Sequence, residues 1–383
     1  DLSRLVQKLS DILRAAFSHP LAGRKPQSLK QSLGGPHQGA FDFEALSRIV
    51  GKGAPRDELP VGRRRRVEHA LAELESQRFF AAPNDAEGEG RPCFGFQFDN
   101  CAAAAQAFRE RLPEVVALVK AISIAELEAT GRYVEAEHDL VFEAFGEHSL
   151  SADDLARFPD YLVCIPPQRN DAPENANLME MLSSALPVKV LVQTSDLLEE
   201  ASIGTGHFAF GVRSARLATT AMGLGGMFVL QTPSANLFAL RRRVEHGMEC
   251  REPALFSVYA GAPHGAGPLP PYLSAAAAMQ SRAFPAFSYD AAAGRNWAER
   301  FSLENNPQPE DDWPAENLPY VDTAWQRASE RCAFTFADFM LCDARNAAHF
   351  ALVPAERWNG QMLPAADWLA LDEQRAALQV PYL

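Results

Sequence analysis

A glycine-rich turn is the first feature of the sequence that could bind a cofactor. Residues Gly204–Ala209 follow the pattern G-x-G-x-x-A, which binds the pyrophosphate of a dinucleotide when a strand directly precedes it and a helix directly follows. The preceding apolar run ends near Thr194, about ten residues earlier, and the gap holds three carboxylates that would repel a pyrophosphate: Asp196, Glu199 and Glu200. An NAD(P)-dependent enzyme using this turn is therefore an alternative interpretation, not the main one.

A second glycine-rich segment, His264–Gly267, resembles the oxyanion loop of lipases. The chain contains no G-x-S-x-G nucleophile motif, so hydrolase chemistry is not expected. Both glycine-rich segments follow predicted strands, at the edge where open α/β sheets bind ligands. We predict that any site lies in the loops 166–171, 196–207, 231–234 and 261–267. No catalytic residue is assigned, and the candidate cofactor-binding residues are Asp171, Glu200, Gly204, Gly206, His207 and His264.

The six cysteines show no spacing that predicts a metal site. No C-x-x-C pair and no Cys/His array at zinc spacing occurs, and a disulfide framework is not expected in so long a chain with so few cysteines. We expect reduced thiols in a cytoplasmic protein, most of them buried as small apolar side chains. Cys164, which ends an apolar run before two prolines, is predicted to be one of these core thiols.

Composition places the chain among ordinary globular proteins. Its 383 residues are 47% hydrophobic and 22% charged, and this length predicts two or three domains. The net charge of −13 argues against nucleic-acid binding, which needs a basic surface. No apolar run approaches the roughly 18–20 residues that span a bilayer. Because the chain begins at Asp1 and not at Met, we interpret it as part of a longer protein.

The charge is unevenly distributed along the chain. Residues 1–82 contain 14 Lys/Arg and 9 Asp/Glu, a net charge of +5, whereas the remainder contains 22 and 40, a net charge of −18. We predict that 1–82 form a separate basic helical region. Four consecutive arginines, Arg63–Arg66, lie at the amino end of a helix predicted over about Arg66–Phe80, where cations oppose the helix dipole. They form either a docking surface for an anionic partner or a solvated charge run.

Residues 83–150 are predicted to combine a linker with helices. Pro83–Gly90 has the composition of a linker, and one or two helices follow over 101–130, broken near Pro113. The stretch 133–148 is ambiguous between helix and strand.

Residues 151–290 show the alternation of strands and helices that is typical of a doubly wound, parallel α/β sheet. Ser151 is predicted to cap a short helix together with Asp154. Short apolar runs predict strands at Tyr161–Ile165, Val188–Val192, Met227–Leu230, Leu255–Tyr259 and Ala286–Tyr289. The helices between them are predicted at Asn175–Leu186, Ser214–Met222, Ser234 to about His246, and Tyr272–Phe284.

Residues 291–383 are predicted to form an irregular and helical C-terminal extension. The first part is rich in proline and tryptophan. It is interpreted as an ordered wrapping segment whose large aromatic side chains need burial, namely Trp297, Phe301, Trp313 and Trp325. Helices are expected near 322–332 and 335–350.

Several segments between about 160 and 313 occur in an order found in a known family. They are the strand Pro187–Thr194, the helix with Leu217–Gly223 leading into Met227–Leu230, the strand in Glu252–Ala260, and Ser281–Asp290. This order resembles the thiamine-diphosphate domain of the pyruvate:ferredoxin (2-oxoacid:acceptor) oxidoreductase family, over roughly 150 of the 383 residues. The resemblance implies a thiamine-diphosphate-domain-like sheet.

The cofactor motifs of that family are missing. The family binds Mg²⁺ and the diphosphate through Gly-Asp-Gly and a later Asn, chemistry that suits a hard cation. Matching the strands places those positions near 166–168, which reads Pro-Pro-Gln, and near 199–200, which reads Glu-Glu. The family's cluster-ligand cysteine falls at about 261–263, which reads Gly-Ala-Pro. The resemblance therefore implies a domain that kept its scaffold and lost its cofactor.

These observations predict a fragment of a 2-oxoacid:ferredoxin oxidoreductase-like redox protein whose α/β domain acts structurally. Thiamine diphosphate, Mg²⁺ and any iron–sulfur cluster would then lie elsewhere in the parent protein. Its partners would be other domains or subunits and a ferredoxin-type acceptor, with no nucleic acid and no membrane. The alternatives are an altered thiamine-diphosphate site using Asp171 or Glu200, the NAD(P)-dependent enzyme, and a non-catalytic interaction or scaffold module that docks through the basic N-terminal helix.

Overall fold

The computed structural model describes residues 2–18, 26–27, 29, 42–51, 59–80, 92–169, 172–184, 186–200, 208–210, 212–262 and 267–383. These residues belong to two compact units. Unit 1 comprises Asp1–Gly95 and Ala107–Pro159, and unit 2 comprises Phe96–Gln106 and Asp160–Leu383.

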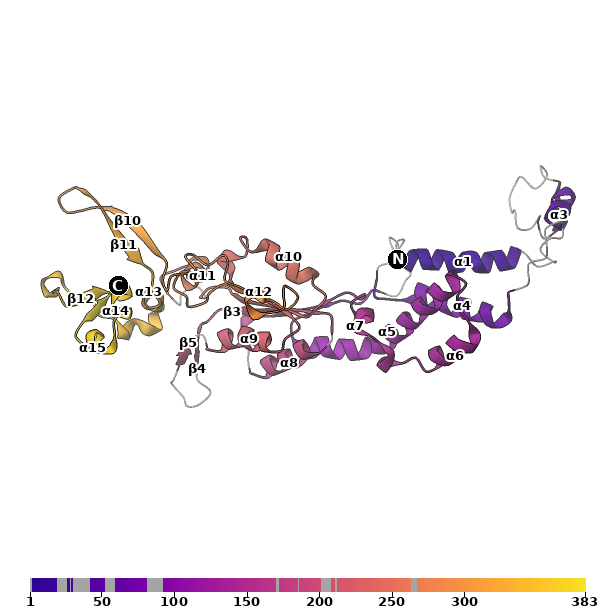
Figure 1. The fold of residues 1–383 in the computed structure, drawn as a ribbon, viewed down its shortest axis with the longest axis horizontal. Coiled ribbons are helices and arrows are strands. Elements are labelled where there is room, and N and C mark those ends of the chain that lie inside the picture. The colour runs from indigo at the N-terminus through magenta and orange to yellow at the C-terminus, as the bar shows by residue number, and fades with distance from the viewer. Residues whose placement is uncertain are drawn as a thin grey trace. The chain divides into compact units, whose positions relative to one another are not determined.

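Unit 1 is helical in its described residues. Its elements are α1 (Leu2–Ser18), α3 (Phe43–Gly51), α4 (Val61–Ser76), the greater part of α5 (Cys101–Ala129), α6 (Glu135–Glu143), the 3₁₀ turn η1 (Glu147–Ser149) and α7 (Ala152–Leu155). Helix α1 packs along α4 (Figure 1), and Leu9 of α1 and Val67 and Leu74 of α4 are buried.

Unit 1 differs from the sequence-based prediction in two details and resolves or confirms it in two others. Helix α4 begins at Val61, five residues before the predicted start, so the arginine run lies inside its first turns. Helix α5 continues through Pro113 without a break. Pro113 is exposed, so water can solvate the carbonyl group that loses its helical donor. The ambiguous stretch contains helix α6, and Ser151 and Asp154 form the predicted capping box.

Unit 2 is built on a mostly parallel sheet of seven strands in the order β1-β2-β3-β7-β6-β8-β9. Their bounds are Gln97–Phe98, Tyr161–Ile165, Val188–Thr194, Ala254–Tyr259, Phe228–Pro233, Phe287–Asp290 and Phe301–Ser302, in that order. The first five run parallel to one another. Strand β8 runs antiparallel to β6, so the prediction of a wholly parallel sheet is wrong at that edge.

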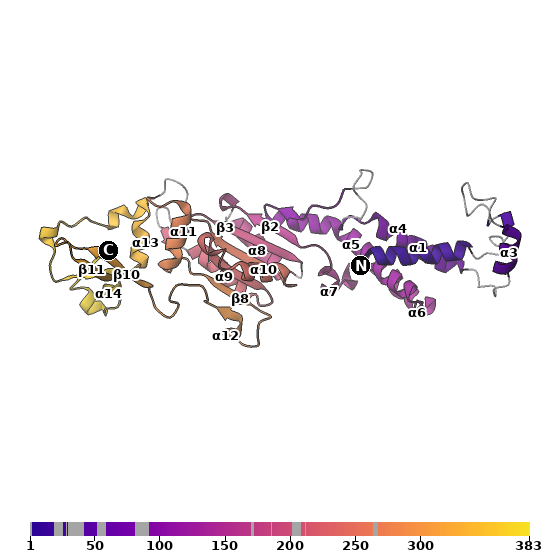
Figure 2. The ribbon, with the colours of Figure 1, turned by 90° about the horizontal axis from the view of Figure 1, so that it is seen from above.

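Helices cover both faces of this sheet. They are α8 (Ala172–Ser183), α9 (Val212–Gly223), α10 (Arg241–Glu249) and α11 (Pro271–Gln280). Figure 1 shows α10 on one side of the sheet and α8 and α9 on the other, and Figure 2 shows the sheet from above. The 3₁₀ turn η3 (Ser234–Asn236) interrupts the helix predicted from Ser234. The central strands β6 and β7 are buried along their whole length, as expected for parallel strands between two helical layers.

The C-terminal part of unit 2 contains short elements around small sheets. They are α12 (Trp297–Arg300), the antiparallel pair β10 (Ala315–Val321) and β11 (Arg327–Ala333), α13 (Phe336–Leu341), the 3₁₀ turns η4 (Ala344–His349) and η5 (Ala355–Arg357), β12 (Met362–Pro364), α14 (Ala365–Leu369), α15 (Glu373–Ala376) and β13 (Val380–Tyr382). The helix expected near 322–332 is wrong, because that stretch pairs with β10 as a strand.

Two expectations about burial are also wrong. Trp297 and Trp325 are exposed, so they do not anchor a wrapping segment. Of the six cysteines only Cys101 is buried, and Cys164 is exposed because its side chain lies on the less covered face of β2. Within the described residues, no helix is both long enough and apolar enough to cross a membrane.

Candidate functional site

Most of the predicted site residues lie outside the described residues: Asp171, Gly204, Gly206, His207 and His264. Glu200 is placed only by its backbone, as the last residue of the short strand β4 (Leu198–Glu200), which pairs antiparallel with β5 (Phe208–Phe210). In the sequence, Gly204 and Gly206 thus lie between two strands that pair antiparallel, and α9 begins only after β5. This arrangement does not supply the strand–turn–helix geometry that a dinucleotide fingerprint requires.

An ion-paired cluster lies at the carboxyl ends of β3 and β7, the edge where the sequence predicts a site. The guanidinium of Arg345, in η4, donates two hydrogen bonds of 2.7 Å to the carboxylate of Asp196, which follows β3. It also donates from Nε to Asp343 at 3.0 Å. These bonds keep the pKa of Asp343 below its usual range and raise that of Arg345. We call Asp196, Asp343 and Arg345 the Arg345 cluster.

The C-terminal segment closes this edge of the sheet with apolar packing as well. Phe339 of α13 is buried against Tyr259, the last residue of β7, and against Leu197. Thr335 and Asp338 form a capping box that starts α13 at this position. The Arg345 cluster is therefore held in place by an ordered helix from its own chain.

The cavity beside the Arg345 cluster has a volume of about 30 Å³. It is lined by Tyr259, Ser274, Phe339 and Asn346, among others, and the hydroxyls of Tyr259 and Ser274 lie 3.2 Å apart. A volume of this size holds one or two water molecules, whereas a cofactor pocket takes about 300–1,000 Å³.

The described residues at this edge do not fit Mg²⁺ and thiamine diphosphate. Both carboxylates are engaged by Arg345, which in turn is not free to bind a diphosphate. No group of three or more His, Cys, Asp or Glu side chains in the described part of the chain could hold a metal ion. We therefore derive no chemical step through this cofactor.

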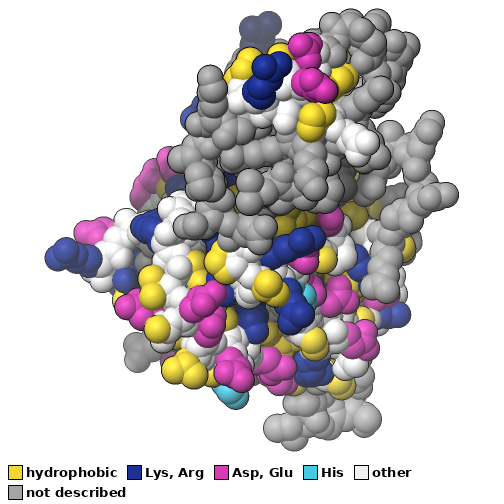
Figure 3. Space-filling model, turned by 90° about the vertical axis from the view of Figure 1, so that its right-hand side faces the viewer, with side chains coloured by type: hydrophobic (Ala, Val, Ile, Leu, Met, Phe, Trp, Pro, Cys, Tyr) yellow, Lys and Arg dark blue, Asp and Glu magenta, His cyan; other side chains and the backbone are white. Residues whose placement is uncertain are grey.

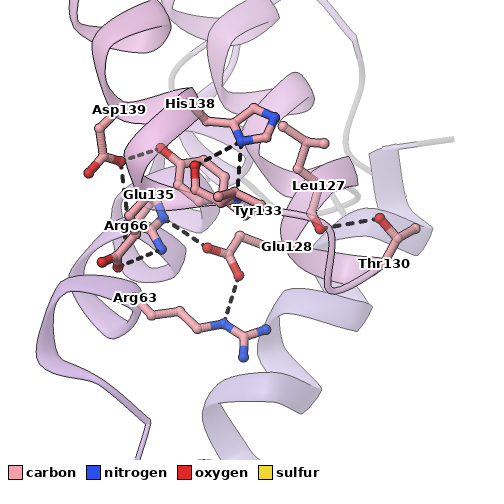
Figure 4. Close-up of polar contacts among 10 residues, drawn as sticks. Arg63, Arg66, Leu127, Glu128, Thr130, Tyr133, Glu135, His138 and Asp139 are labelled. Carbon is pink, nitrogen blue, oxygen red and sulfur yellow. Dashed lines mark hydrogen bonds and ion pairs between the residues drawn. The ribbon is translucent and has the colours of Figure 1, made fainter.

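A second cluster of charges lies inside unit 1 (Figure 4). The carboxylate of Glu128, near the end of α5, is only 1% exposed and accepts a 2.8 Å hydrogen bond from Nε of Arg63 and another from Nε of Arg66. Arg66 also lies within 3.3 Å of Glu135 at the start of α6. Its guanidinium stacks on the ring of Tyr133 at 3.8 Å. We call these residues, with Asp139, the Glu128 cluster.

The Glu128 cluster explains two of the four arginines in the run. Carboxylates compensate Arg63 and Arg66 for their unfavourable place in the first turns of α4, so these two side chains connect helices. Arg64 pairs with Glu68 of the same helix. The face seen in Figure 3 shows basic and acidic side chains interspersed over its described part. These contacts do not support a docking surface made by the whole arginine run.

We predict that Tyr133 of the Glu128 cluster loses its proton at a higher pH than an unfolded tyrosine does. Burial and a 2.7 Å hydrogen bond to Asp139 raise the pKa of Tyr133 to about 12. An unfolded tyrosine ionises near 10, so the folded state holds the proton more tightly. The resulting stabilisation is present below pH 10 and is lost as the pH rises towards 12. The difference in tyrosinate absorbance between the protein and Tyr133→Phe should titrate near pH 12, and a midpoint near 10 would contradict this contact.

Lys189 is a buried charge that is not among the predicted site residues. It lies in β3, where its ammonium donates to the carbonyl groups of Cys250 and Glu252 just beyond α10. A single lysine within the otherwise apolar run Val188–Val192 is a signal of such a contact. By contrast, nothing local to Arg345 or Glu128 indicates their partners, which lie 149 and 62–65 residues away along the chain.

Comparisons with known proteins do not assign this chain to a family. The sequence matches no protein-family model, and no curated protein is significantly similar to it.

Proposed function

We propose that this chain is part of a 2-oxoacid:ferredoxin oxidoreductase-like redox protein and that the α/β domain in unit 2 has a structural role. In this proposal the sheet is a thiamine-diphosphate-domain-like scaffold without its own Mg²⁺/thiamine-diphosphate site. Its partners are other domains or subunits of the parent protein, where the cofactors bind and from which a ferredoxin-type acceptor takes electrons.

The Arg345 cluster is the observation that carries this proposal. A site at the carboxyl edge needs open volume, a free cation for the diphosphate and free carboxylates for the metal. At the ends of β3 and β7 the described residues leave a cavity of about 30 Å³, and Arg345 is paired with both Asp196 and Asp343. The chain's own segment 336–349 contributes Phe339, Asp343 and Arg345 to the lining of this small cavity.

The order of elements gives the proposal its second support. The mostly parallel sheet and its helices follow the succession strand, helix, strand, helix on which the resemblance to the oxidoreductase family rests. The positions matching the family's Gly-Asp-Gly and cluster cysteine hold other residues. A retained scaffold without these groups is suited to contacts with neighbouring domains.

Calorimetric titration of Mg²⁺ and thiamine diphosphate into the full chain tests the proposal. We expect no saturable heat, because the charged groups at the edge are already paired. The variant Arg345→Ala removes the blocking side chain and is also expected to bind nothing, since the metal-binding motif is missing. Circular dichroism of the variant verifies that it is folded. Saturable, metal-dependent heat with either protein would refute the proposal.

A further inference from the structure

The hairpin formed by β10 and β11 is exposed on both of its faces. Almost every residue of the two strands is exposed, including Leu318, Tyr320 and Val321. Figure 1 shows the two strands as a ribbon with no further strand along either edge among the described residues. A two-stranded ribbon without a third strand or a covering helix is marginally stable in water, so a hairpin of this length is suited to pairing with another element.

The two edges of the hairpin differ in what they offer to such an element. The N–H of Phe334 donates to the carbonyl oxygen of Pro314, and the N–H of Asp322 donates to that of Gln326. These bonds mark the two ends of the ladder between the strands. Every second residue of each strand, starting next to these bonded residues, therefore directs its N–H and C=O groups away from the other strand. On β10 this outward set includes Pro319, which has no N–H to donate. On β11 the outward residues are 327, 329, 331 and 333, each with a donor and an acceptor. Only the β11 edge is therefore open over its whole length.

Charged side chains mark the two faces of the β11 edge. Arg327 and Arg331 lie on one face and Glu330 lies on the other, because side chains alternate along a strand. All three are exposed, and none has an ion-pair partner within the described part of the chain. Each therefore remains available to a charge on an incoming strand.

These charges argue against a second copy of the chain as the occupant. Antiparallel pairing of β11 with itself over its full length would place Glu330 opposite Glu330 of the other copy. Pairing centred on Ser329 would place Arg327 opposite the other copy's Arg331. Like charges directly opposite each other destabilise a sheet, and edge charges of this kind prevent self-association.

The tip of the hairpin carries an exposed tryptophan in a strained conformation. Trp325 has a φ of 60°, a left-handed value that hairpin loops of this kind usually assign to glycine. The residue is 90% exposed. Trp325 is thus exposed at the tip of the hairpin in a strained backbone conformation, and tryptophan is among the residues that dominate the energy of protein interfaces.

We propose that the β11 edge accepts an extended strand of a protein partner. The partner strand carries acidic residues opposite Arg327 and Arg331 and a basic residue opposite Glu330. Backbone hydrogen bonds supply affinity and the alternating charges supply specificity, as in other cases of strand addition. This inference does not depend on the cofactor question, because the hairpin is separate from the Arg345 cluster.

Binding of two synthetic peptides to the full chain tests this proposal. One has the central sequence Asp-Lys-Thr-Val-Asp, which places the required charges opposite β11 in antiparallel register. The other has the charges exchanged, Lys-Asp-Thr-Val-Lys. Fluorescence anisotropy should show saturable binding of the first peptide at least about tenfold tighter than of the second. The double variant Arg327→Glu/Arg331→Glu should reverse this preference.

Ser329→Pro supplies the test of the edge itself. Ser329 lies opposite Pro319 and directs its N–H outward, so proline there removes an edge donor without removing a bond to β10. It should abolish peptide binding, whereas the control Ser329→Ala should not. The proposal is overturned if neither peptide binds, if both bind equally, or if Ser329→Pro binds as well as the control. It is also overturned if the protein alone self-associates and Ser329→Pro abolishes that association.

Discussion

Replacing Glu128 with leucine should destabilise unit 1 by about 3 kcal/mol. Glu128 is almost completely buried and is the common partner of Arg63 and Arg66. Its removal leaves two guanidinium groups facing an apolar side chain, which is more costly than the loss of the attraction itself. We take the lower end of the usual range because Arg63 keeps access to water. Urea unfolding followed by far-UV circular dichroism measures the change.

The same helix provides the control. Arg64 and Glu68 form an ion pair of the same length, 2.8 Å, but their side chains are 61% and 46% exposed. Glu68→Leu should therefore cost about 0.5 kcal/mol or less. Equal effects of the two substitutions would show that the burial of Glu128 has no energetic consequence. Adding Arg63→Met and Arg66→Met to Glu128→Leu should recover part of the loss, because no unpaired charge then remains beside the leucine.

The central strands could be predicted from sequence because their signal is local. The run Tyr161–Ile165 is continuous, apolar and closed by prolines, and β2 has these same bounds. Strand direction is not encoded in such a run, so the antiparallel β8 could not be distinguished from its parallel neighbours. Arg327–Ala333 contains residues that favour helices, and only its pairing with β10 makes it a strand.

The charge clusters were predictable only in outline. The location of the Arg345 cluster at the carboxyl edge follows from the topology of parallel strands. The arginine run in the Glu128 cluster was conspicuous because it opposes a helix dipole. Which carboxylate compensates it depends on how α4 and α5 pack. In the same way, Asp196 meets Arg345 only because the C-terminal segment returns to the end of β3. Contacts between residues so far apart in sequence leave no periodic pattern to read.

Gly261→Ala should destabilise unit 2 by about 3 kcal/mol, combining backbone strain with overpacking. Gly261 follows β7 with a φ of +93°, and a β-carbon there would overlap the carbonyl oxygen of Pro271, the first residue of α11. The start of α11, the helix from which Ser274 lines the cavity, would have to move. Urea unfolding of unit 2 measures the effect.

Gly225→Ala separates the two contributions to this loss. Gly225 has a similar φ of +98°, but a β-carbon there would meet no atom within 4 Å. Its substitution should cost only the strain of the left-handed backbone, about 1 kcal/mol. If Gly261→Ala costs no more than this control, then α11 yields without resistance and the closed edge beside Arg345 can open. The small cavity would then no longer argue against a ligand, and the structural role proposed for the sheet would lose its principal support. A loss well above the control would instead mean that packing between β7 and α11 keeps this edge closed.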